Sequence, residues 1–556
     1  MNKPSLLEIE KSFLKGPKKI VLKGNALTIP EILSVAQSHP TVSFTTDKKV
    51  LNGINNAHEV MIEQVKKGVP IYGCNTGYGE RAAVIVNQGT AEERLQMARK
   101  VSEGISHIDV SVGPEFSSAV IRAAMLIRIN MLTNNVSAVK LADLEIYKSM
   151  LNAGITPVVN QYGGIGASGD LAHNSRVVSA ARQLPGTQVR SKNGELGEAQ
   201  AILSAAGIKK LEMDPKAGLG LVNGDNFSTA LAALLAADTV TALLLSFAIG
   251  ALSIEVLMGT DRSFHQMLAM VRPHQGQQEV SAIFRNLLSG SKLAFQEMNG
   301  HVLHEKGVKV QDGYSLRCLA QYHAVNVEKI KQIIETITIN ANSVSDNPLW
   351  VPPEMATENE TPWQWVSGGN FIAMHMVESM DSLRKTLTQI TKLNDRHLGR
   401  LVSPIHNNGL PANLSDKDAI TACAFKGVQI QSGMFDVYSS LLSMPVSTFF
   451  GVHEEGNQDI TSHALTSGIL GLENLRVTRY SLAQQMLAVH QGVLLRGGAK
   501  LLSPKTKHLF NFIHQKVEYV KEERPLHNEI EALYQSIVSG ELNDVLLKVL
   551  DGSYSR

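Results

Sequence analysis

The most informative run in this sequence is Gly163-Gly164-Ile165-Gly166-Ala167-Ser168-Gly169-Asp170-Leu171-Ala172. Its small residues let the backbone fold back sharply before the helical pattern that begins at Leu171. In such a turn the amide nitrogen of Gly169 can attack the carbonyl carbon of Ala167, and loss of one water closes a five-membered ring. Loss of a second water converts Ser168 to dehydroalanine. These residue types therefore predict an electrophile that the chain makes from its own backbone.

The turn also resembles a known signature. GASGD, at residues 166–170, is similar to the signature of the histidine, phenylalanine and tyrosine ammonia-lyases and the related aminomutases. In that family the Ala-Ser-Gly forms a methylidene-imidazolone group, MIO. The resemblance implies that Ala167, Ser168 and Gly169 form MIO and that no external cofactor is needed. The run departs from the family pattern at His173, where the family has Pro-Leu.

The same glycines satisfy the dinucleotide-binding pattern G-x-G-x-x-G, at Gly164, Gly166 and Gly169, after a strand-like piece at 155–159. That fold requires a strand-helix-strand unit and an acidic residue about 20 residues further on, which binds the ribose. The nearest acidic residues lie in a polar loop at 195–198. A dinucleotide-binding oxidoreductase therefore stays open as an alternative, and a non-catalytic helical scaffold as a third.

Composition predicts a protein with a small ligand. The 556 residues are 44% apolar, with 52 Lys and Arg against 51 Asp and Glu. No net charge therefore favours nucleic acid or an anionic membrane as a partner. Cys74, Cys318 and Cys423 are far apart and lack zinc spacing, which predicts a reducing compartment and no metal. Residues 1–16 include charges and lack the apolar core of a signal peptide, so we expect a cytoplasmic protein.

Helical periodicity predicts a mainly α fold. Strand-like pieces occur near the start, at 19–22 and 42–45, and apolar residues then recur at three- and four-residue spacing. The helical segments that we expect are 29–36, 90–101, 114–132, 141–153, 171–184, 227–258, 279–305, 314–339, 370–396, 415–442, 463–497 and 525–550. The charge-free part of the apolar segment 227–258 is too short to span a bilayer, which predicts a buried bundle helix. We expect an N-terminal mixed domain that carries the turn, 1–215, and a long central helical bundle, 216–556.

Two further loops resemble motifs of the same family. Residues 71–79, Ile-Tyr-Gly-Cys-Asn-Thr-Gly-Tyr-Gly, are punctuated by glycine, so this loop can close over a site. They resemble the lid YG-x-NTG-[FY]-G, whose first tyrosine is the catalytic base, which implies that role for Tyr72. Residues 216–224 resemble K-x-GL-x-L-[IV]-NGT, in which the asparagine, here Asn223, contacts the MIO region and the substrate amine. Asp225 replaces the usual threonine, and Asn223 or Asp225 can also cap the helix that follows.

Residues 311–318, Gln-Asp-Gly-Tyr-Ser-Leu-Arg-Cys, are similar to the run QD-x-YS-[LI]-RC of these lyases. Tyr314 and Arg317 are three residues apart and so share one helix face. The planar guanidinium of an arginine can bind a carboxylate through two parallel hydrogen bonds. The resemblance implies that Arg317 holds the substrate carboxylate and that Tyr314 is one of the catalytic residues.

The remaining motifs supply substrate-binding residues. Residues 342–349 resemble the turn NS-x-[TSN]-DNP-L, and Gly-Gly-Asn-Phe follows at 368–371, although Ile372 begins a departure from the family's His-Gly or Gln-Gly. Residues 453–459 resemble the HNQD run of phenylalanine-type members more than the NQEDH run of histidine-type members. The substrate-binding residues that the resemblance implies are Asn347, Asn370, Phe371, Glu454 and Gln458.

The resemblance as a whole implies an MIO-dependent ammonia-lyase. The substrate amine would add to the methylidene carbon derived from Ser168, and Tyr72 would remove a β-proton, which leads to an α,β-unsaturated acid. A 2,3-aminomutase stays open, because it differs in returning the ammonia before the product leaves. Family members are homotetramers whose sites draw residues from several subunits, so we expect a homotetramer.

The substrate ring would be selected by the helix at 95–104. Family members use two adjacent residues there, which are Ser102 and Glu103 or, with the other choice of anchor, Lys100 and Val101. A charged side chain beside the ring would favour a polar aromatic substrate, because burying it against plain phenyl is costly. The form of the motif at 453–459 favours phenylalanine-like members, so we expect phenylalanine or tyrosine ahead of histidine.

Overall fold

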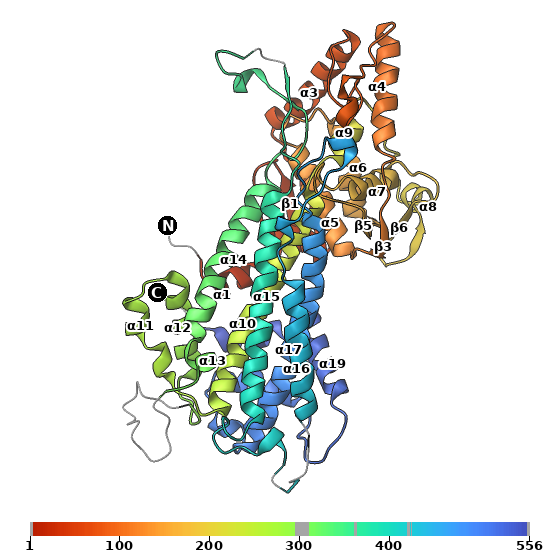
Figure 1. The fold of residues 1–556 in the computed structure, drawn as a ribbon. Coiled ribbons are helices and arrows are strands. Elements are labelled where there is room, and N and C mark those ends of the chain that lie inside the picture. The colour runs from red at the N-terminus through yellow and green to blue at the C-terminus, as the bar shows by residue number, and fades with distance from the viewer. Residues whose placement is uncertain are drawn as a thin grey trace.

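The chain is mainly α, and a long helical bundle carries a smaller mixed region at one end (Figure 1). The structure is a computed structural model that describes residues 4–294, 311–360, 364–416, 418–419, 423 and 425–552. The expected fold class is therefore confirmed, with the Ala-Ser-Gly turn in the mixed region and helix α10 (Asn226–Val256) at the centre of the bundle.

The elements follow the chain in this order. The helices before residue 216 are α1 (Leu6–Phe13), α2 (Ile29–Gln37), α3 (Lys48–Lys66), α4 (Ala91–Ile105), α5 (Ser118–Leu132), α6 (Leu141–Ala153), α7 (Leu171–Ala181) and α8 (Ala199–Ala205). The helices after it are α9 (Ala217–Val222), α10, α11 (Gln266–Met270), α12 (Gln275–Leu288), α13 (Tyr314–Arg317), α14 (Leu319–Ala341), α15 (Met374–Val402), α16 (Lys426–Leu442), α17 (Ala464–Leu495), α18 (Thr506–His514), α19 (His527–Val538) and α20 (Asn543–Leu550). The strands are β1 (Lys19–Leu22), β2 (Thr41–Phe44), β3 (Val112–Glu115), β4 (Thr156–Pro157), β5 (Asn160–Tyr162), β6 (Gln188–Arg190), β7 (Leu196–Glu198), β8 (Leu349–Trp350) and β9 (Trp365–Val366). Two 3-10 helices, η1 (Gly79–Ala83) and η7 (Glu454–Gly456), belong to the candidate active site.

The strands around the glycine run pair only with antiparallel neighbours. β5, which precedes the run, pairs with β3, and β6, which follows α7, pairs with β4 and β7. A dinucleotide-binding fold needs a parallel β-α-β unit across the glycine loop. Within the described residues no such unit surrounds the run, so the structure removes the dinucleotide-binding alternative.

Helix α10 is buried around nearly its whole circumference. Helices α15 and α17 run alongside it (Figure 1). The segment Ala217–Val256 is long and apolar enough to cross a membrane by length and composition alone, but 78% of its most apolar window is buried inside the protein. The expectation of a buried bundle helix is therefore confirmed for this segment.

Most expected helices lie within a few residues of their predicted bounds, and the differences have local causes. The helix expected at 114–132 begins at Ser118, because Val112–Glu115 pairs with β5 and Ser117 caps α5. The segment expected as one helix at 525–550 is α19 and α20, separated by a turn in which Gly540 has a φ of 77°.

Other differences concern missed elements and residues outside the description. Helix α3 was not predicted, since it buries few apolar side chains and contains Gly and Asn in its interior. Helix α12 accounts for the start of the segment expected at 279–305, and residues 295–310 lie outside the described residues.

Candidate active site

The glycine run forms a tight turn between β5 and α7. Gly166 and Gly169 have φ angles of 65° and 67°, in the left-handed region that glycine adopts without strain. A Cβ atom on Gly169 would lie 2.5 Å from the carbonyl carbon of Gly224, so no side chain fits there. Ala167 is buried and Ser168 is half-buried. The turn therefore has the small, sharply folded backbone that ring closure between Gly169 and Ala167 requires.

The residues that follow the turn form hydrogen bonds to the junction of α9 and α10. The backbone N–H of Asp170 donates to the carbonyl oxygen of Gly224 at 2.9 Å, and the Asn174 amide donates to the same oxygen at 3.1 Å. The Asp170 carboxyl group accepts hydrogen bonds from the backbone and the hydroxyl of Ser228. Burial raises the pKa of Asp170 to about 7. These contacts hold the turn against the start of the central helix.

A third segment, which lies just before α17, forms hydrogen bonds to the turn. The Gln458 side-chain amide donates to the Ser168 hydroxyl at 2.7 Å, and the Ser462 hydroxyl donates to the Gly166 carbonyl at 2.9 Å. The backbone N–H of His463 donates to the Ile165 carbonyl at 2.9 Å. The structure thus brings Gln458 to Ser168 across 290 residues of chain.

The loop of Tyr72 lies against the segment that carries Gln458. The Tyr72 hydroxyl accepts a hydrogen bond from the backbone N–H of Gly79 at 3.0 Å. Gly79 begins η1, and a Cβ atom on it would collide with the Glu454 carboxylate, which belongs to η7. Burial raises the pKa of the Tyr72 hydroxyl, and the negative charge of Glu454 raises it further. Tyr72, Ser168, Glu454 and Gln458 therefore belong to one region of the molecule.

Asn223 and Asn347 lie next to each other, and Asn223 directly precedes Gly224, which contacts the turn. The Asn223 amide donates to the Asn347 carbonyl at 3.4 Å, and the side-chain oxygen of Asn223 is buried without a hydrogen-bond partner among the described residues. The side-chain oxygen of Asn347 accepts from the backbone N–H of Gly368 at 2.8 Å. Exposed Asn370 and half-buried Phe371 follow Gly368 directly before α15. A buried acceptor without a partner is costly, so Asn223 offers a position for a donor from a ligand or from the modified turn.

Sequence reasoning missed the buried charges beneath these asparagines. The guanidinium of Arg128, on α5, is fully buried and donates to the carbonyls of Gly220, Asn223 and Ser345. Lys216 and Asp346 form a fully buried ion pair, with 2.8 Å between Nζ and Oδ2. Arg128 stands in the middle of the apolar run of α5, and this position could have indicated the buried network, because a buried charge requires partners.

Asp225, which departs from the family pattern, joins the same network. Its backbone N–H donates to the Ser345 hydroxyl at 3.0 Å, and its carboxylate accepts from the Asn340 amide at 2.9 Å. Burial raises the pKa of Asp225. The side chain of Asp225 forms no hydrogen bond to the first turn of α10, so Asp225 does not cap this helix.

Tyr314 and Arg317 lie at the opposite end of the bundle (Figure 1). The adjacent Asp312 accepts a hydrogen bond from Thr260, which follows the last turn of α10, whereas Asn223 precedes its first turn. A helix of the 31 residues of α10 is about 46 Å long. The Arg317 guanidinium stacks 4.6 Å from the ring centre of Tyr314, whose side chain is 72% exposed. One copy of the chain therefore does not bring Arg317 to Ser168.

The helix expected to select the substrate ring is α4. The Ser102 hydroxyl accepts from the backbone N–H of Gly218 at 2.6 Å, and the Glu103 carboxylate forms an ion pair with Arg182. Lys100 is exposed. Glu103, one of the two charged side chains considered for the position beside the ring, is therefore already paired with Arg182.

The described residues contain no group of three or more His, Cys, Asp or Glu side chains that could hold a metal ion. His301 and His304 lie outside the described residues.

The fold agrees with comparisons to known proteins. The family model described as aromatic amino acid lyase matches residues 27–515. A phenylalanine ammonia-lyase of Nostoc punctiforme is 31% identical over 512 residues, which cover 90% of this chain and 88% of the relative. A histidine ammonia-lyase of Alkaliphilus oremlandii is 29% identical over 534 residues, which cover 96% and 99%. The solved structure of a tyrosine aminomutase from Streptomyces globisporus has a TM-score of 0.85 at 26% identity, over 95% of this chain and 98% of that one.

Proposed function

We propose that this chain eliminates ammonia from an aromatic L-amino acid. It belongs to the aromatic amino acid lyase family and is therefore a carbon–nitrogen lyase. The product would be the α,β-unsaturated acid. We place phenylalanine and tyrosine ahead of histidine as the substrate. The form of the motif at 453–459 supports this order, and the pairing of Glu103 with Arg182 weakens the case for a polar ring.

The observation that carries the proposal is the hydrogen bond of 2.7 Å from Gln458 to the hydroxyl of Ser168, in a turn that excludes side chains at Gly169. We propose that Ala167, Ser168 and Gly169 form MIO, which supplies an electrophile for the substrate amine. The residues of this chain fit that group. The turn is small and left-handed at Gly169, and the buried side-chain oxygen of Asn223 has no partner in the part of the chain that the structure describes.

Tyr72 is the residue that we assign to removal of the β-proton. Its hydroxyl accepts a hydrogen bond from Gly79, which favours the deprotonated form, while burial and the nearby Glu454 oppose it. Because the net effect raises the pKa of Tyr72, its hydroxyl can hold a proton taken from the substrate, and we propose that it returns this proton to solvent when the loop opens. We also propose that Asn223, Asn347, Asn370, Phe371 and Glu454 bind and orient the substrate.

The substrate carboxylate needs a cation that the described part of one chain does not bring to this site. We propose that Arg317, with Tyr314 beside it, reaches the turn of another copy in a homotetramer. An unpartnered apolar stripe on α16 supports assembly. Ile430, Met434, Val437 and Leu441 follow one another at helical spacing, and each is more than half exposed. Such stripes are typical of faces that another helix covers.

The function is tested with purified protein and a panel of L-phenylalanine, L-tyrosine and L-histidine. Absorbance of the unsaturated acid reports elimination, and chromatography reports β-amino acids. We expect an unsaturated acid from phenylalanine or tyrosine. Turnover of histidine alone would refute the proposed order of substrates.

A second candidate, a 2,3-aminomutase, is favoured by the structural likeness to the tyrosine aminomutase. A β-amino acid as the main product would favour it over the lyase. Our proposal for the compartment is the cytoplasm, on the basis of the cysteine content.

A further inference from the structure

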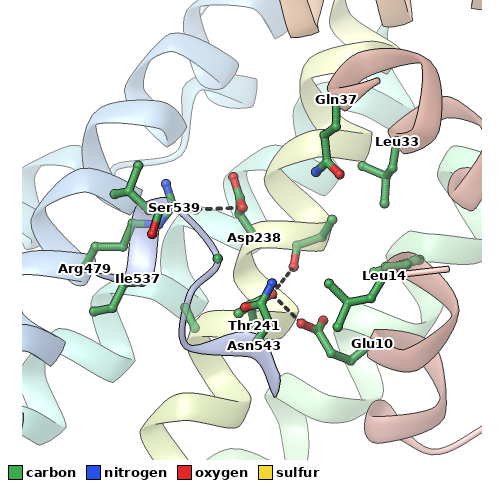
Figure 2. Close-up of a pocket in the computed structure, with 15 residues that line it drawn as sticks. Glu10, Leu14, Leu33, Gln37, Asp238, Thr241, Arg479, Ile537, Ser539 and Asn543 are labelled. Carbon is green, nitrogen blue, oxygen red and sulfur yellow. Dashed lines mark hydrogen bonds and ion pairs between the residues drawn. The ribbon is translucent and has the colours of Figure 1, made fainter. Parts of the chain in front are cut away.

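A cavity of about 370 Å³ lies inside the bundle, away from the turn (Figure 2). It is lined by residues of α1, α2, α10 and α17, and by the end of α19, the start of α20 and the turn between them, and it opens to the surface beside the exposed side chains of Leu14 and Val538. Asp238 and Thr241 contribute from α10, and Asp238 lies about 18 Å along that helix from Asn226. The cavity is therefore separate from the site of Ser168, and a ligand can bind in it whether or not the proposed lyase activity is correct.

The cavity holds more negative than positive charge. The charged groups that line it are Glu10 from α1, Asp238 from α10 and Arg479 from α17. Arg479 is engaged by Asp238, with 2.6 Å between Nη2 and Oδ1. Helix α2 and the turn between α19 and α20 contribute only uncharged side chains to the described lining. When both carboxyl groups are ionised, the lining carries a net charge of one negative unit.

Glu10 is an incompletely satisfied carboxyl group. Its residue is 2% exposed, and its Oε1 accepts from the Thr241 hydroxyl at 2.8 Å. Its Oε2 is buried without a hydrogen-bond partner among the described residues. Figure 2 shows the carboxyl group of Glu10 directed toward Thr241 and Asn543, inside the ring of lining residues. A buried carboxylate oxygen without a donor is costly, so this position is suited to an incoming cationic donor.

Burial raises the pKa of Glu10 to about 7, the Thr241 hydroxyl lowers it and the charge of Asp238 raises it. Near neutral pH the group therefore exchanges a proton readily, and a cation that reaches it would take the place of that proton.

We propose that this cavity binds a small organic primary amine in its ammonium form. The N–H donors of an ammonium group match the acceptors of Glu10, whose Oε2 has no partner among the described residues, and of Asp238, which lines the same cavity. The apolar side chains of Phe13, Leu33 and Ile537 then contact a short alkyl or aryl body. An anion is disfavoured by the excess of carboxylate, and a quaternary ammonium lacks the donors that Glu10 requires.

The test is calorimetric titration of the full-length protein with n-butylammonium chloride at pH 8 and pH 6, with tetramethylammonium chloride as the matched salt. We expect saturable binding of one n-butylammonium per chain at pH 8. Binding should be about tenfold weaker at pH 6, because the competent, ionised form of Glu10 is about tenfold less populated there. Titrations in buffers of different ionisation enthalpy should show release of nearly one proton per amine at pH 6.

Two variants test whether n-butylammonium binds beside Glu10. Glu10→Gln keeps the size of the side chain and should weaken n-butylammonium binding at least tenfold and abolish the proton release. Asp544→Asn removes an exposed charge of α20 outside the cavity and should bind as the wild type does. Unchanged binding by Glu10→Gln would place the amine elsewhere and overturn the proposal. Absence of saturable binding at pH 8, or equal binding of tetramethylammonium, would overturn it with the wild-type protein alone.

Discussion

Gly169 is the residue on which the proposed ring closure depends most directly. Its φ of 67° and the contact of 2.5 Å that a Cβ atom would make with Gly224 exclude any side chain there. Gly169→Ala should therefore retain the full mass of the peptide around Ser168, without the loss of two waters, and should lack lyase activity. Peptide mass spectrometry measures this directly.

A matched control exists at Gly186. It has a φ of 77°, but nothing lies within 4 Å of its added Cβ. Gly186→Ala is therefore strained without a collision and should still lose two waters at Ser168. Loss of two waters in Gly169→Ala would contradict the proposed closure.

Tyr72 is expected to contribute strongly to turnover and little to stability. Tyr72→Phe removes only the hydroxyl that accepts from Gly79, so the change in the free energy of unfolding should be about 1 kcal/mol or less. Turnover should fall by about 10² to 10⁴, the usual contribution of a general base. Steady-state kinetics and a thermal unfolding curve of the same preparation give both values.

The control for Tyr72 is Tyr78, in the same loop. Its hydroxyl donates to the backbone carbonyls of Gly73 and Val101 and so has a structural role. Tyr78→Phe should lower turnover much less than Tyr72→Phe. The reverse order would move the assignment of the base to Tyr78.

At the scale of elements, α10 and the start of α18 meet at a buried carboxyl group. Glu255 accepts from the backbone N–H of Ser503 at 2.7 Å and from the Thr506 hydroxyl at 2.6 Å. Burial raises its pKa from 4.5 to about 7. Between these two values the folded chain holds a proton that the unfolded chain has released, so the free energy of unfolding falls as pH rises through this range.

Glu255→Gln should therefore reduce the loss of stability between pH 5 and pH 8. Thermal unfolding midpoints at both pH values measure it, and Glu358→Gln, which changes an exposed carboxyl group, is the control. Part of the pH dependence should remain, because burial raises the pKa of Asp170 in the same direction. An unchanged pH dependence in Glu255→Gln would show that its proton is not linked to unfolding.

At the scale of the whole molecule, the length of α10 separates Arg317 from Ser168, so assembly decides whether the proposed site is complete. Ser168→Ala and Arg317→Ala should each be inactive alone, the second mainly through weaker substrate binding. Subunits of the two variants, unfolded together and refolded at equal concentration, should recover about one quarter of the wild-type activity, since a quarter of the sites would join two intact residues. Recovery of no activity would contradict a site shared between copies.

The division into 1–215 and 216–556 stays a proposal. One hydrophobic core contains side chains from both parts, such as Ile121 and Leu244, and α5 packs along α10. The mixed region and the bundle therefore share their apolar interior, even though the strands lie mostly in the first part.

The sequence by itself determined the mainly α fold class, most helix positions and the motifs that point to the aromatic amino acid lyases. Helical periodicity and turn chemistry are local, so they can be read within a window of a few turns. Only the tertiary structure decided that Gln458 meets Ser168, that Arg128 supports Asn223, that Arg182 neutralises Glu103 and that Arg317 lies a bundle length away. The physical reason is that these relations join residues from distant elements, and their geometry depends on how the helices pack rather than on the residues beside them.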